Sequence, residues 1–281
     1  MAAKGPLVTQ SLPENDAEAV SAALNPAIPN VARMYDFMLG GKENYVSDRA
    51  AVASLIELSG TDIPAAARLN RAFLGRAVQY VASHGVTQFL DVGAGLPTQQ
   101  SVHQVAQEIA PGIRTVYVDN DPVVLTHSRA LLGSNSTTAA VLGDVRDPAG
   151  IIADPAVREL LDFARPVCIL LVAVLHFVPD AADPQGLLAA FRDAMVPGSY
   201  LILSHGTVDG APPEVAAKAD ASRVYDQATA QVTLRDAAQV AALLDGFTLI
   251  EPGLVHTSQW RPLVPADYEF DAFLAAVGRK D

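Results

Sequence analysis

The sequence predicts an α/β fold in which helices cover both faces of a doubly wound, mostly parallel sheet. Three observations support this. From Val86 onward, short apolar runs alternate with stretches whose apolar residues recur at helical spacing, which is the pattern of a parallel sheet. The continuous apolar run 167–175 is typical of a central strand buried on both faces. The 281 residues are 50% hydrophobic and 18% charged, which supplies a large core and excludes wholesale disorder.

Composition also limits the class of protein. The formal net charge of −12 argues against a protein that binds nucleic acid through its whole surface. Cys168 is the single cysteine, so neither a disulfide framework nor a cysteine-based zinc site is expected. The apolar run 167–175 is too short to span a bilayer, and the N-terminus has no sustained apolar segment of the kind that a secretory signal needs. We therefore expect a cytoplasmic protein with no membrane partner.

Each element of the sheet is predicted from its local pattern. Short apolar segments bounded by turn residues predict five parallel strands, at 88–92, 115–118, 138–142, 167–175 and 200–204. Amphipathic stretches between them predict the crossover helices. Beyond this region we expect helices at 211–230 and 234–244, and two closing strands at 247–250 and 273–277, which bring the sheet to seven strands.

The N-terminal region has a different pattern. The first thirty residues show no clear periodicity and are expected to form a mobile arm or an irregular lead-in. From about Asn30 to His84 the apolar spacing is helical, interrupted by the double glycine at 40–41. We predict an N-terminal arm and helical cap over 1–84, and a ligand-binding α/β domain over 85–281.

The strongest local motif is FLDVGAG at 89–95, at the end of a predicted strand and before a helix. Its glycines allow a tight turn and a close approach of the backbone to a ligand. A glycine turn of this kind also occurs with no ligand, so the motif alone is weak.

Acidic residues end the next two predicted strands. Asp119 can accept hydrogen bonds from both hydroxyls of an adenosine ribose, whereas Asp121 is better placed to cap the following helix. Asp144 and the amide of Val145 can recognise an adenine, although Asp144 paired with Arg146 in an ordinary turn is an equal alternative. The carboxyl edge of such a sheet is where ligands bind.

The glycine motif favours a nucleoside over a dinucleotide. The third glycine of a dinucleotide motif is replaced by Thr98, and Pro97 removes an N–H that a phosphate could use. A nicotinamide-dependent oxidoreductase therefore remains an alternative, although this sequence lacks part of the glycine motif of that class.

Four ordered segments carry a resemblance to a known family. FLDVGAG (89–95), VYVDND (116–121), GDVRD (143–147) and VLHFVPD (174–180) resemble the motifs of class I S-adenosylmethionine-dependent methyltransferases. The whole chain is similar to a group of bacterial S-adenosyl methyltransferases whose marker is the segment RMYDFMLGGKENY at 33–45. The resemblance implies a Rossmann-like methyltransferase fold, S-adenosyl-L-methionine as cofactor, and methyl transfer to an acceptor that it does not identify.

The resemblance also implies roles for individual residues. Those that wrap the methionine part of the cofactor are Asp91, Gly93, Ala94 and Gly95. Asp119 holds the ribose, and the adenine is contacted by Asn120, Asp144 and Val145. Ala173 and Leu175 lie beside the sulfonium, and a lid over the pocket contains Tyr35, Gly40, Gly41 and Lys42. A helix–turn–helix joint without a ligand is an equal alternative for that lid segment.

The chemistry needs few catalytic groups. A sulfonium methyl group is already activated, so the protein mainly has to position the acceptor and exclude water. His176 and His205 are the candidate bases if the acceptor must lose a proton, although each is as readily explained as a buried structural histidine. No metal-ligand spacing is present, so no metal is expected. We expect a small-molecule acceptor bound under the cap. A non-catalytic protein that binds S-adenosylmethionine or S-adenosylhomocysteine is a further alternative.

Overall fold

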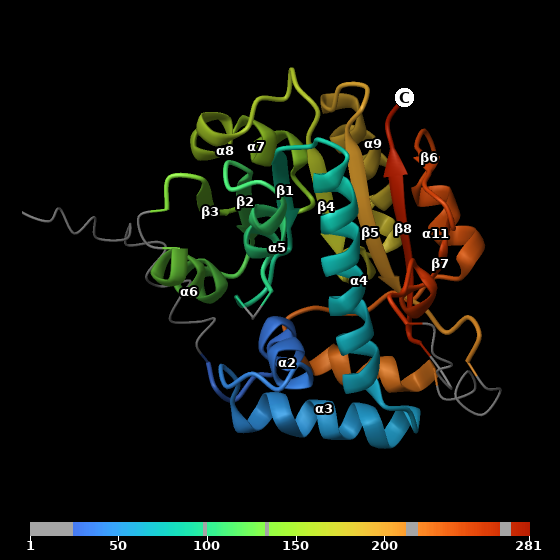
Figure 1. The fold of residues 1–281 in the computed structure, drawn as a ribbon. Helices are drawn as coiled ribbons and strands as arrows, with labels where there is room; N and C mark the ends of the chain where they lie inside the picture. Colours follow the sequence, from blue (N-terminus) through green and yellow to red (C-terminus); the bar gives the residue numbers. More distant parts are fainter. Residues whose placement is uncertain (1–24, 98–99, 133–134, 212–218, 265–270) are drawn as a thin grey trace, which may run out of the picture.

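The computed structural model describes residues 25–97, 100–132, 135–211, 219–264 and 271–281 (Figure 1). The predicted N-terminal arm falls almost entirely outside these ranges, as does Thr98.

The described chain forms a sheet with strand order β3-β2-β1-β4-β5-β8-β6, and β7 also pairs with β8. The five parallel strands are β1 (Gln88–Val92), β2 (Arg114–Asp119), β3 (Thr138–Leu142), β4 (Cys168–Val172) and β5 (Tyr200–Gly206). The antiparallel β8 (Phe273–Arg279) follows β5, and its other partners are β6 (Thr248–Leu249) and β7 (Val255–His256). The predicted mostly parallel, doubly wound sheet is confirmed.

The structure corrects two of the predicted elements. The apolar run 167–175 leaves the strand after Val172, because Ala173 adopts a positive φ of 57° and a 3₁₀ turn follows at Leu175–Phe177. Hydrophobicity alone does not distinguish a strand from a buried turn that follows it. Of the predicted helix 211–230, residues 212–218 lie outside the described ranges, and the helical part of the described remainder is the 3₁₀ helix η3 (Ala219–Gln227).

Helices cover both faces of the sheet, and alternate residues of the buried strands point to opposite sides. Ile169 and Leu171 of β4 pack into one core, whereas Cys168 and Leu170 pack into the other. The first core includes residues of α7 (Pro148–Ala153), α8 (Pro155–Leu160), α9 (Pro184–Ala194) and α11 (Ala237–Leu243). The second includes residues of α4 (Ile63–Ser83) and α5 (Val102–Ile109). Helix α6 (Pro122–Leu132) packs along β2 and β3.

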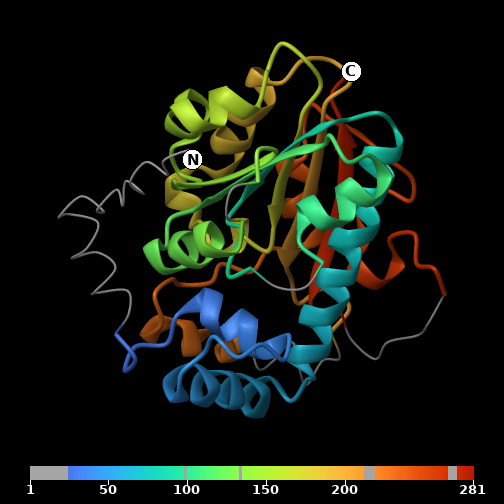
Figure 2. The same ribbon diagram turned by 60° about the vertical axis from the view of Figure 1, so that its left-hand side comes forward.

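A helical cap lies across the carboxyl ends of the parallel strands (Figures 1 and 2). It contains α2 (Val31–Met38), α3 (Val46–Ser59) and the first turns of α4. Its apolar core is completed by side chains from a distant segment around η3, namely Val224, Tyr225 and Ala228. The cap is therefore built from two parts of the chain that are far apart in sequence.

Helix α4 links the cap to the sheet. Ala67 near its start belongs to the cap core, whereas Phe73, Ala77 and Val81 pack against the sheet. The division at residue 84 stays a prediction, because this one helix contributes to both cores. Among the described helices, none is both long and apolar enough to cross a membrane. The cytoplasmic location also stays a prediction.

Candidate functional site

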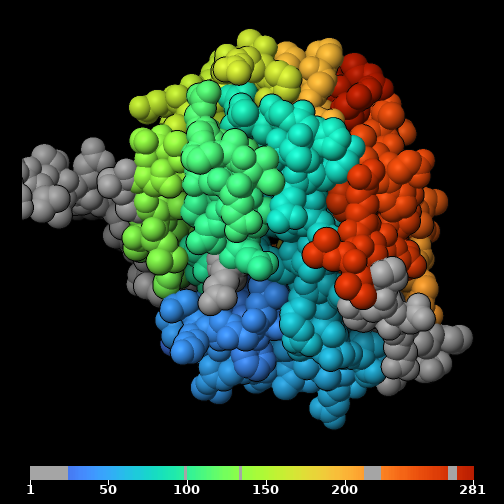
Figure 3. Space-filling view, viewed as in Figure 1, coloured from blue at the N-terminus to red at the C-terminus, as the bar shows by residue number. Residues whose placement is uncertain are grey.

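A cavity of about 520 Å³ lies between the cap and the carboxyl ends of β1 to β4. It opens at the point where strand order reverses, since β2 lies on one side of β1 and β4 on the other. Open α/β sheets bind ligands at such a switch point, and the volume is typical of a small-molecule site. In Figure 3 the cap, in blue, meets the lower end of the green and cyan part of the core.

The glycine turn after β1 forms one wall of the cavity. The N–H groups of Gly93 and Ala94 both donate to the carbonyl of Val118, at 2.8 and 3.1 Å. Gly93 has a φ of 74°, and a Cβ at that position would lie 2.2 Å from Val174 Cγ2. A glycine is required there for two reasons, the backbone conformation and the close approach of the next loop.

Asp119 links this turn to the end of β2. Its Oδ2 accepts from the Gly95 N–H at 2.8 Å, and its Oδ1 accepts from the Asp121 N–H at 2.9 Å. Burial raises the pKa of Asp119 to about 6, although those backbone hydrogen bonds oppose the shift. Asp121 accepts from the Val123 N–H at 2.8 Å, so it caps α6 as predicted.

Asp91 is the most enclosed carboxylate of the cavity, with 6% of its surface exposed. No described residue donates a hydrogen bond to it. Burial raises its pKa to about 7, the positive charge of Arg71 opposes that shift, and the negative charge of Asp119 adds to it. Arg71 also lines the cavity and comes from α4. The cavity thus places a cation and two carboxylates near one another.

The third acidic strand end is already paired within the protein. The Nε of Arg146 donates to Asp144 Oδ1 at 2.9 Å, and Asn120 Nδ2 donates to its Oδ2 at 3.2 Å. The hydrogen bond from Arg146 lowers the pKa of Asp144 to about 2. Asn120, Asp144 and Val145 all line the cavity. The Arg146 pairing considered for Asp144 is therefore present, and the residue still borders the site.

The loop after β4 differs from the sequence prediction at one position. Ala173 lines the cavity, and its N–H donates to the carbonyl and hydroxyl oxygens of Ser204 at 3.2 and 3.0 Å. Leu175 does not line the cavity, because the turn directs it into the core beneath the sheet, where it is fully buried. Val174 occupies the wall instead, against Gly93.

The two candidate bases have different surroundings. His176 lines the cavity, and its Nδ1 accepts from the Gly206 N–H at 3.3 Å. His205 is fully buried outside the cavity lining, with both ring nitrogens engaged by Gly206 and Arg235. His205 is therefore a structural histidine in this arrangement.

Of the four residues predicted for the lid, Tyr35 lines the cavity. Its hydroxyl accepts from Asn70 Nδ2 at 2.9 Å and donates to the Ala67 carbonyl at 3.3 Å. Burial raises the pKa of Tyr35 above its usual value. The ring is thus fixed against α4 and remains a neutral part of the wall.

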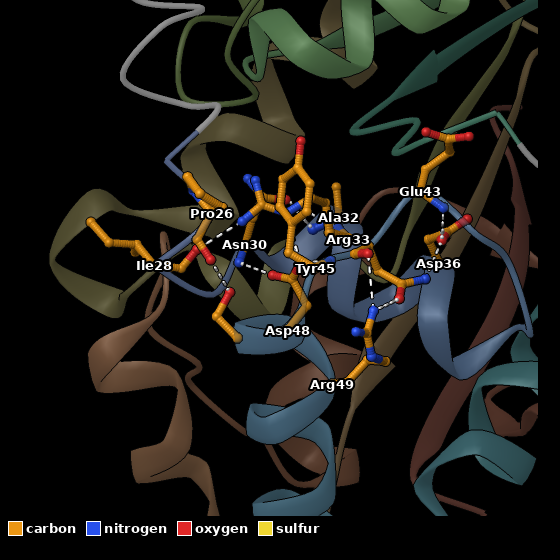
Figure 4. A network of polar contacts seen from close by, with 12 residues as sticks. Pro26, Ile28, Asn30, Ala32, Arg33, Asp36, Glu43, Tyr45, Asp48 and Arg49 are labelled. Atoms are coloured by element: carbon orange, nitrogen blue, oxygen red, sulfur yellow. Dashed lines mark hydrogen bonds and ion pairs between the residues drawn. The ribbon is translucent and has the colours of Figure 1, made fainter.

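Gly40, Gly41 and Lys42 lie outside the cavity lining, at the joint between α2 and α3. This loop folds around Asp36, whose Oδ2 accepts from the Glu43 N–H and from Asn44 Nδ2, each at 2.9 Å (Figure 4). A Cβ on Gly41 would lie 1.9 Å from Asp36 Oδ1. The structure therefore places the double glycine in the helix–turn–helix joint that was the alternative to a ligand-contacting lid.

A second buried carboxylate holds the cap together. Asp48 accepts from Arg33 Nε, Asn30 N–H and Tyr45 N–H at 2.7–2.8 Å (Figure 4). Asp48 is fully buried, and Arg33 is 4% exposed. Most polar residues of the marker segment thus build the cap rather than the cavity wall.

Sequence reasoning missed the residues that roof the cavity. Asn30 caps α2 and donates from its Nδ2 to Asp121 Oδ2 at 2.6 Å, which joins the cap to the end of β2. Thr229 donates its N–H to the Pro29 carbonyl at 3.1 Å, and its hydroxyl accepts from the Val31 N–H at 3.2 Å. A polar residue before an apolar helical pattern was a signal for Asn30. No local pattern marked the segment around Thr229.

Other lining residues complete the roof and the side walls. Several are apolar or aromatic: Met38, Ile63, Phe177, Tyr225, Val232 and Phe273. Among the described residues, no group of three or more His, Cys, Asp or Glu side chains is arranged to hold a metal ion. The cavity therefore has a carboxylate-rich side at the strand ends and an apolar, aromatic side under the cap.

Comparison with protein families matches residues 17–281 to the family described as S-adenosyl methyltransferase. No curated protein sequence gives a significant match. A presumed methyltransferase from Thermobifida fusca YX is 38% identical, with a TM-score of 0.84 over 92% of this chain and 97% of that protein. A DUF574 family protein from Streptomyces avermitilis is also 38% identical, with a TM-score of 0.83 over 90% and 98% of the two chains.

A more distant likeness concerns the fold alone. An O-methyltransferase family protein from Burkholderia thailandensis is 10% identical and superposes with a TM-score of 0.50 over 95% of this chain and 68% of that protein.

Proposed function

Since this chain belongs to the S-adenosyl methyltransferase family and is an S-adenosylmethionine-dependent enzyme, we propose that it methylates a small-molecule acceptor bound between the strand ends and the cap. The family match decides between the two enzyme classes that the glycine motif had left open, in favour of the methyltransferase. The acceptor and the individual site residues are the subject of the proposal.

The cavity suits the cofactor by charge. Asp91 and Asp119 are carboxylates whose burial disfavours their ionised forms, and both line the same space. S-adenosylmethionine carries an ammonium group and ribose hydroxyls that would complement them. Arg71 offers the opposite charge for the cofactor's carboxylate. The charge complementarity with the cofactor rests on the two carboxylates at the ends of β1 and β2 and on Arg71 of α4.

Each side chain then has a defined task. Gly93, Ala94 and Gly95 let the backbone approach the methionine part, and Asp91 with Arg71 orients its charged groups. Asp119 holds the ribose. Asn120, Asp144 and Val145 border the adenine, and Ala173 with Val174 lies beside the sulfonium in place of Leu175. Tyr35 closes the pocket from α2.

When bound, S-adenosylmethionine supplies a methyl group that bonds to the acceptor's lone pair as the carbon–sulfur bond breaks, its electron pair staying on sulfur. The protein's part is to align the acceptor and to exclude water. The roof formed by Asn30, Val31 and the segment 229–233 serves the second task. An in-line transfer needs no further catalytic group unless the acceptor carries a proton.

The observation that carries the small-molecule proposal is this roof. The cap and the segment 229–233 cover the strand ends through the Asn30–Asp121 and Thr229–Pro29 hydrogen bonds, and apolar side chains line the remaining space. A folded protein or a duplex would have to displace that roof to reach Ala173. A ring-sized compound fits beneath it.

The test is to incubate the enzyme with S-adenosylmethionine labelled in its methyl group and an extract separated by ultrafiltration into low-mass and macromolecular fractions. We expect label to be transferred in the low-mass fraction only. Calorimetry with S-adenosylmethionine, run in parallel, establishes that the protein binds its cofactor. Transfer to protein or nucleic acid, with none to the low-mass fraction, would contradict the proposal.

A further inference from the structure

The hydrogen bond between Gly206 and His176 defines the protonation of the His176 ring. A backbone N–H can only donate, so the Nδ1 that receives it at 3.3 Å carries no proton. A neutral imidazole has one proton, which must then be on Nε2. His176 is therefore a hydrogen-bond donor at Nε2, and it has no free lone pair with which to accept a proton.

The neighbouring groups favour this neutral form. Arg235 donates from Nη1 to His205 Nε2 at 2.8 Å, and His205 Nδ1 donates to the Gly206 carbonyl at 2.8 Å. Since a guanidinium only donates and a carbonyl only accepts, His205 is also neutral, with its proton on Nδ1. Burial, with smaller contributions from the neighbouring His205 and Arg235, holds the pKa of His176 well below its usual value.

The Arg235 side chain also fixes the loop that carries His176. It is 4% exposed and donates to the carbonyls of Leu175 and Val178 at 3.1 and 2.9 Å. The His176 carbonyl accepts from the Thr233 N–H at 2.7 Å. Hydrogen bonds thus fix the backbone before, at and after His176, and the Gly206 N–H fixes the ring. The orientation of the ring is therefore set before a ligand binds.

The Nε2 edge of His176 is the edge available to a ligand. The Cγ and Nδ1 atoms face β5, since a Cβ on Gly206 would lie 3.6 Å from each. Nε2 lies across the ring from Cγ, and no described residue bonds to it. Among the described residues, Nε2 has no hydrogen-bond partner and is not fully enclosed by protein atoms. Because His176 lines the cavity, its N–H is accessible there.

Aromatic side chains lie near the His176 ring. The His176 ring centroid lies 4.3 Å from that of Phe177 and 6.0 Å from that of Phe273, and Tyr225 lies 6.0 Å from Phe177. All four residues line the cavity. Aromatic side chains beside a directed N–H favour a ligand that has an aromatic ring and a hydrogen-bond acceptor.

We propose that His176 is a positioning hydrogen-bond donor rather than a general base, and that the acceptor is an aromatic compound whose reactive oxygen accepts from Nε2–H. This inference rests on the proposed function, because it concerns the acceptor side of that same cavity. A phenol would release its proton to solvent before transfer, and His176 would hold the phenolate oxygen. An amine nitrogen has a single lone pair, which cannot both accept from Nε2–H and attack the methyl group, so the donor favours an oxygen as the reactive atom.

The first test measures the ring itself. In protein labelled with ¹⁵N-histidine, we expect the His176 resonances to show a bare Nδ1 and a protonated Nε2, both at pH 7.5 and at pH 6. The signal is assigned by its loss in His176→Gln. A proton on Nδ1, or an imidazolium at pH 6, would overturn the inference.

The second test uses 4-ethylphenol, 4-ethylaniline and ethylbenzene, each titrated into protein saturated with S-adenosylhomocysteine. We expect the phenol to bind about three- to tenfold more tightly than the hydrocarbon and to shift the Nε2–H resonance. A response from the aniline in place of the phenol would overturn the assignment of oxygen as the reactive atom. Equal binding of all three, no binding of any, or binding without a response at Nε2–H would overturn the inference.

A matched pair of variants separates the two roles. His176→Gln keeps an N–H donor near the Nε2 position, whereas His176→Asn keeps only an acceptor for the Gly206 N–H. We expect His176→Gln to retain probe affinity within about threefold, and His176→Asn to lose about tenfold. The opposite order would overturn the donor role. Calorimetry with S-adenosylhomocysteine reports folding of each variant, and failure of the wild-type protein to bind it would instead count against the proposed function.

Discussion

Buried carboxylates occur on both sides of the cavity, and they differ in what satisfies them. In the cap, Asp48 accepts three hydrogen bonds from the protein, one of them from the buried Arg33. At the end of β1, Asp91 accepts none from any described residue, and its pKa is raised to about 7. A carboxylate that is fully paired maintains structure, whereas one that is buried without a partner is suited to a ligand. The comparison predicts opposite responses to mutation.

The largest effect is expected for Asp48→Ala. Removing this carboxylate breaks its buried ion pair with Arg33, which costs about 3–5 kcal/mol of unfolding free energy. Denaturant unfolding followed by circular dichroism measures this. Asp62→Ala is the matched control, because Asp62 caps α4 with an exposed side chain, and a loss of about 1 kcal/mol is expected. Equal losses of unfolding free energy in Asp48→Ala and Asp62→Ala would contradict the structural role assigned to the buried ion pair.

Asp119→Ala should show the opposite pattern, because Asp119 accepts from two backbone N–H groups rather than from a buried arginine. We expect the affinity for S-adenosylmethionine to fall by about 1–3 kcal/mol, because charge-assisted hydrogen bonds to the ribose are lost. The unfolding free energy should change by less than about 1 kcal/mol, since a poorly solvated carboxylate is removed together with its two backbone hydrogen bonds. Calorimetry measures the affinity, and Asp154→Ala, at the cap of α8, serves as control. Unchanged affinity would refute the ribose role.

The affinity for S-adenosylmethionine should depend on pH, because the two cavity carboxylates change their protonation near neutral pH. Asp91 and Asp119 have pKa values raised to about 7 and about 6, so both are largely protonated at pH 5.5 and ionised at pH 8. Ionised Asp91 attracts the ammonium group, and ionised Asp119 accepts from the ribose hydroxyls more strongly than its neutral form. The affinity for S-adenosylmethionine should therefore rise with pH, by about tenfold over this range. Calorimetry at pH 5.5, 6.5 and 8 tests this, and Asp91→Asn should remove the upper part of the rise.

The same shifts act on stability with the opposite sign. Because both pKa values are raised above the ordinary value, the protonated forms are favoured by folding. Their contribution to the stability of the ligand-free protein is therefore full below about pH 4 and is lost as pH rises through 6 and 7. Cofactor binding should accordingly raise the melting temperature more at pH 8 than at pH 5.5.

The smallest effect is expected for Lys42→Ala. Lys42 lies outside the cavity lining, on the exposed joint of the cap. Its removal should change the affinity for S-adenosylmethionine by less than twofold and the unfolding free energy by less than about 0.5 kcal/mol. A large loss of cofactor affinity, measured by calorimetry, would show that the loop between α2 and α3 takes part in cofactor binding.

Residues that follow a local pattern were predictable, and residues joined by long-range contacts were not. The strand ends at Val92, Asp119 and Leu142 follow from short apolar runs that stop at turn residues, so Asp91 and Asp119 could be placed at one edge. The double glycine in the marker segment was recognisable as a break, but its function depends on Asp36, which only the folded loop brings against it. Apolarity could not distinguish Val174 from Leu175, because the left-handed turn at Ala173 decides which one faces the cavity.

The roof over the cavity has a consequence for synthesis of the protein. Thr229 bonds to Val31 across 198 positions of sequence, so the cap emerges from the ribosome long before the segment that secures it. During that interval the apolar faces of Met34, Met38 and Leu55 lack their packing partners Val224 and Tyr225. A closed cofactor pocket can therefore form only late in translation, so the nascent chain acquires its cofactor site close to the time when its sheet is completed.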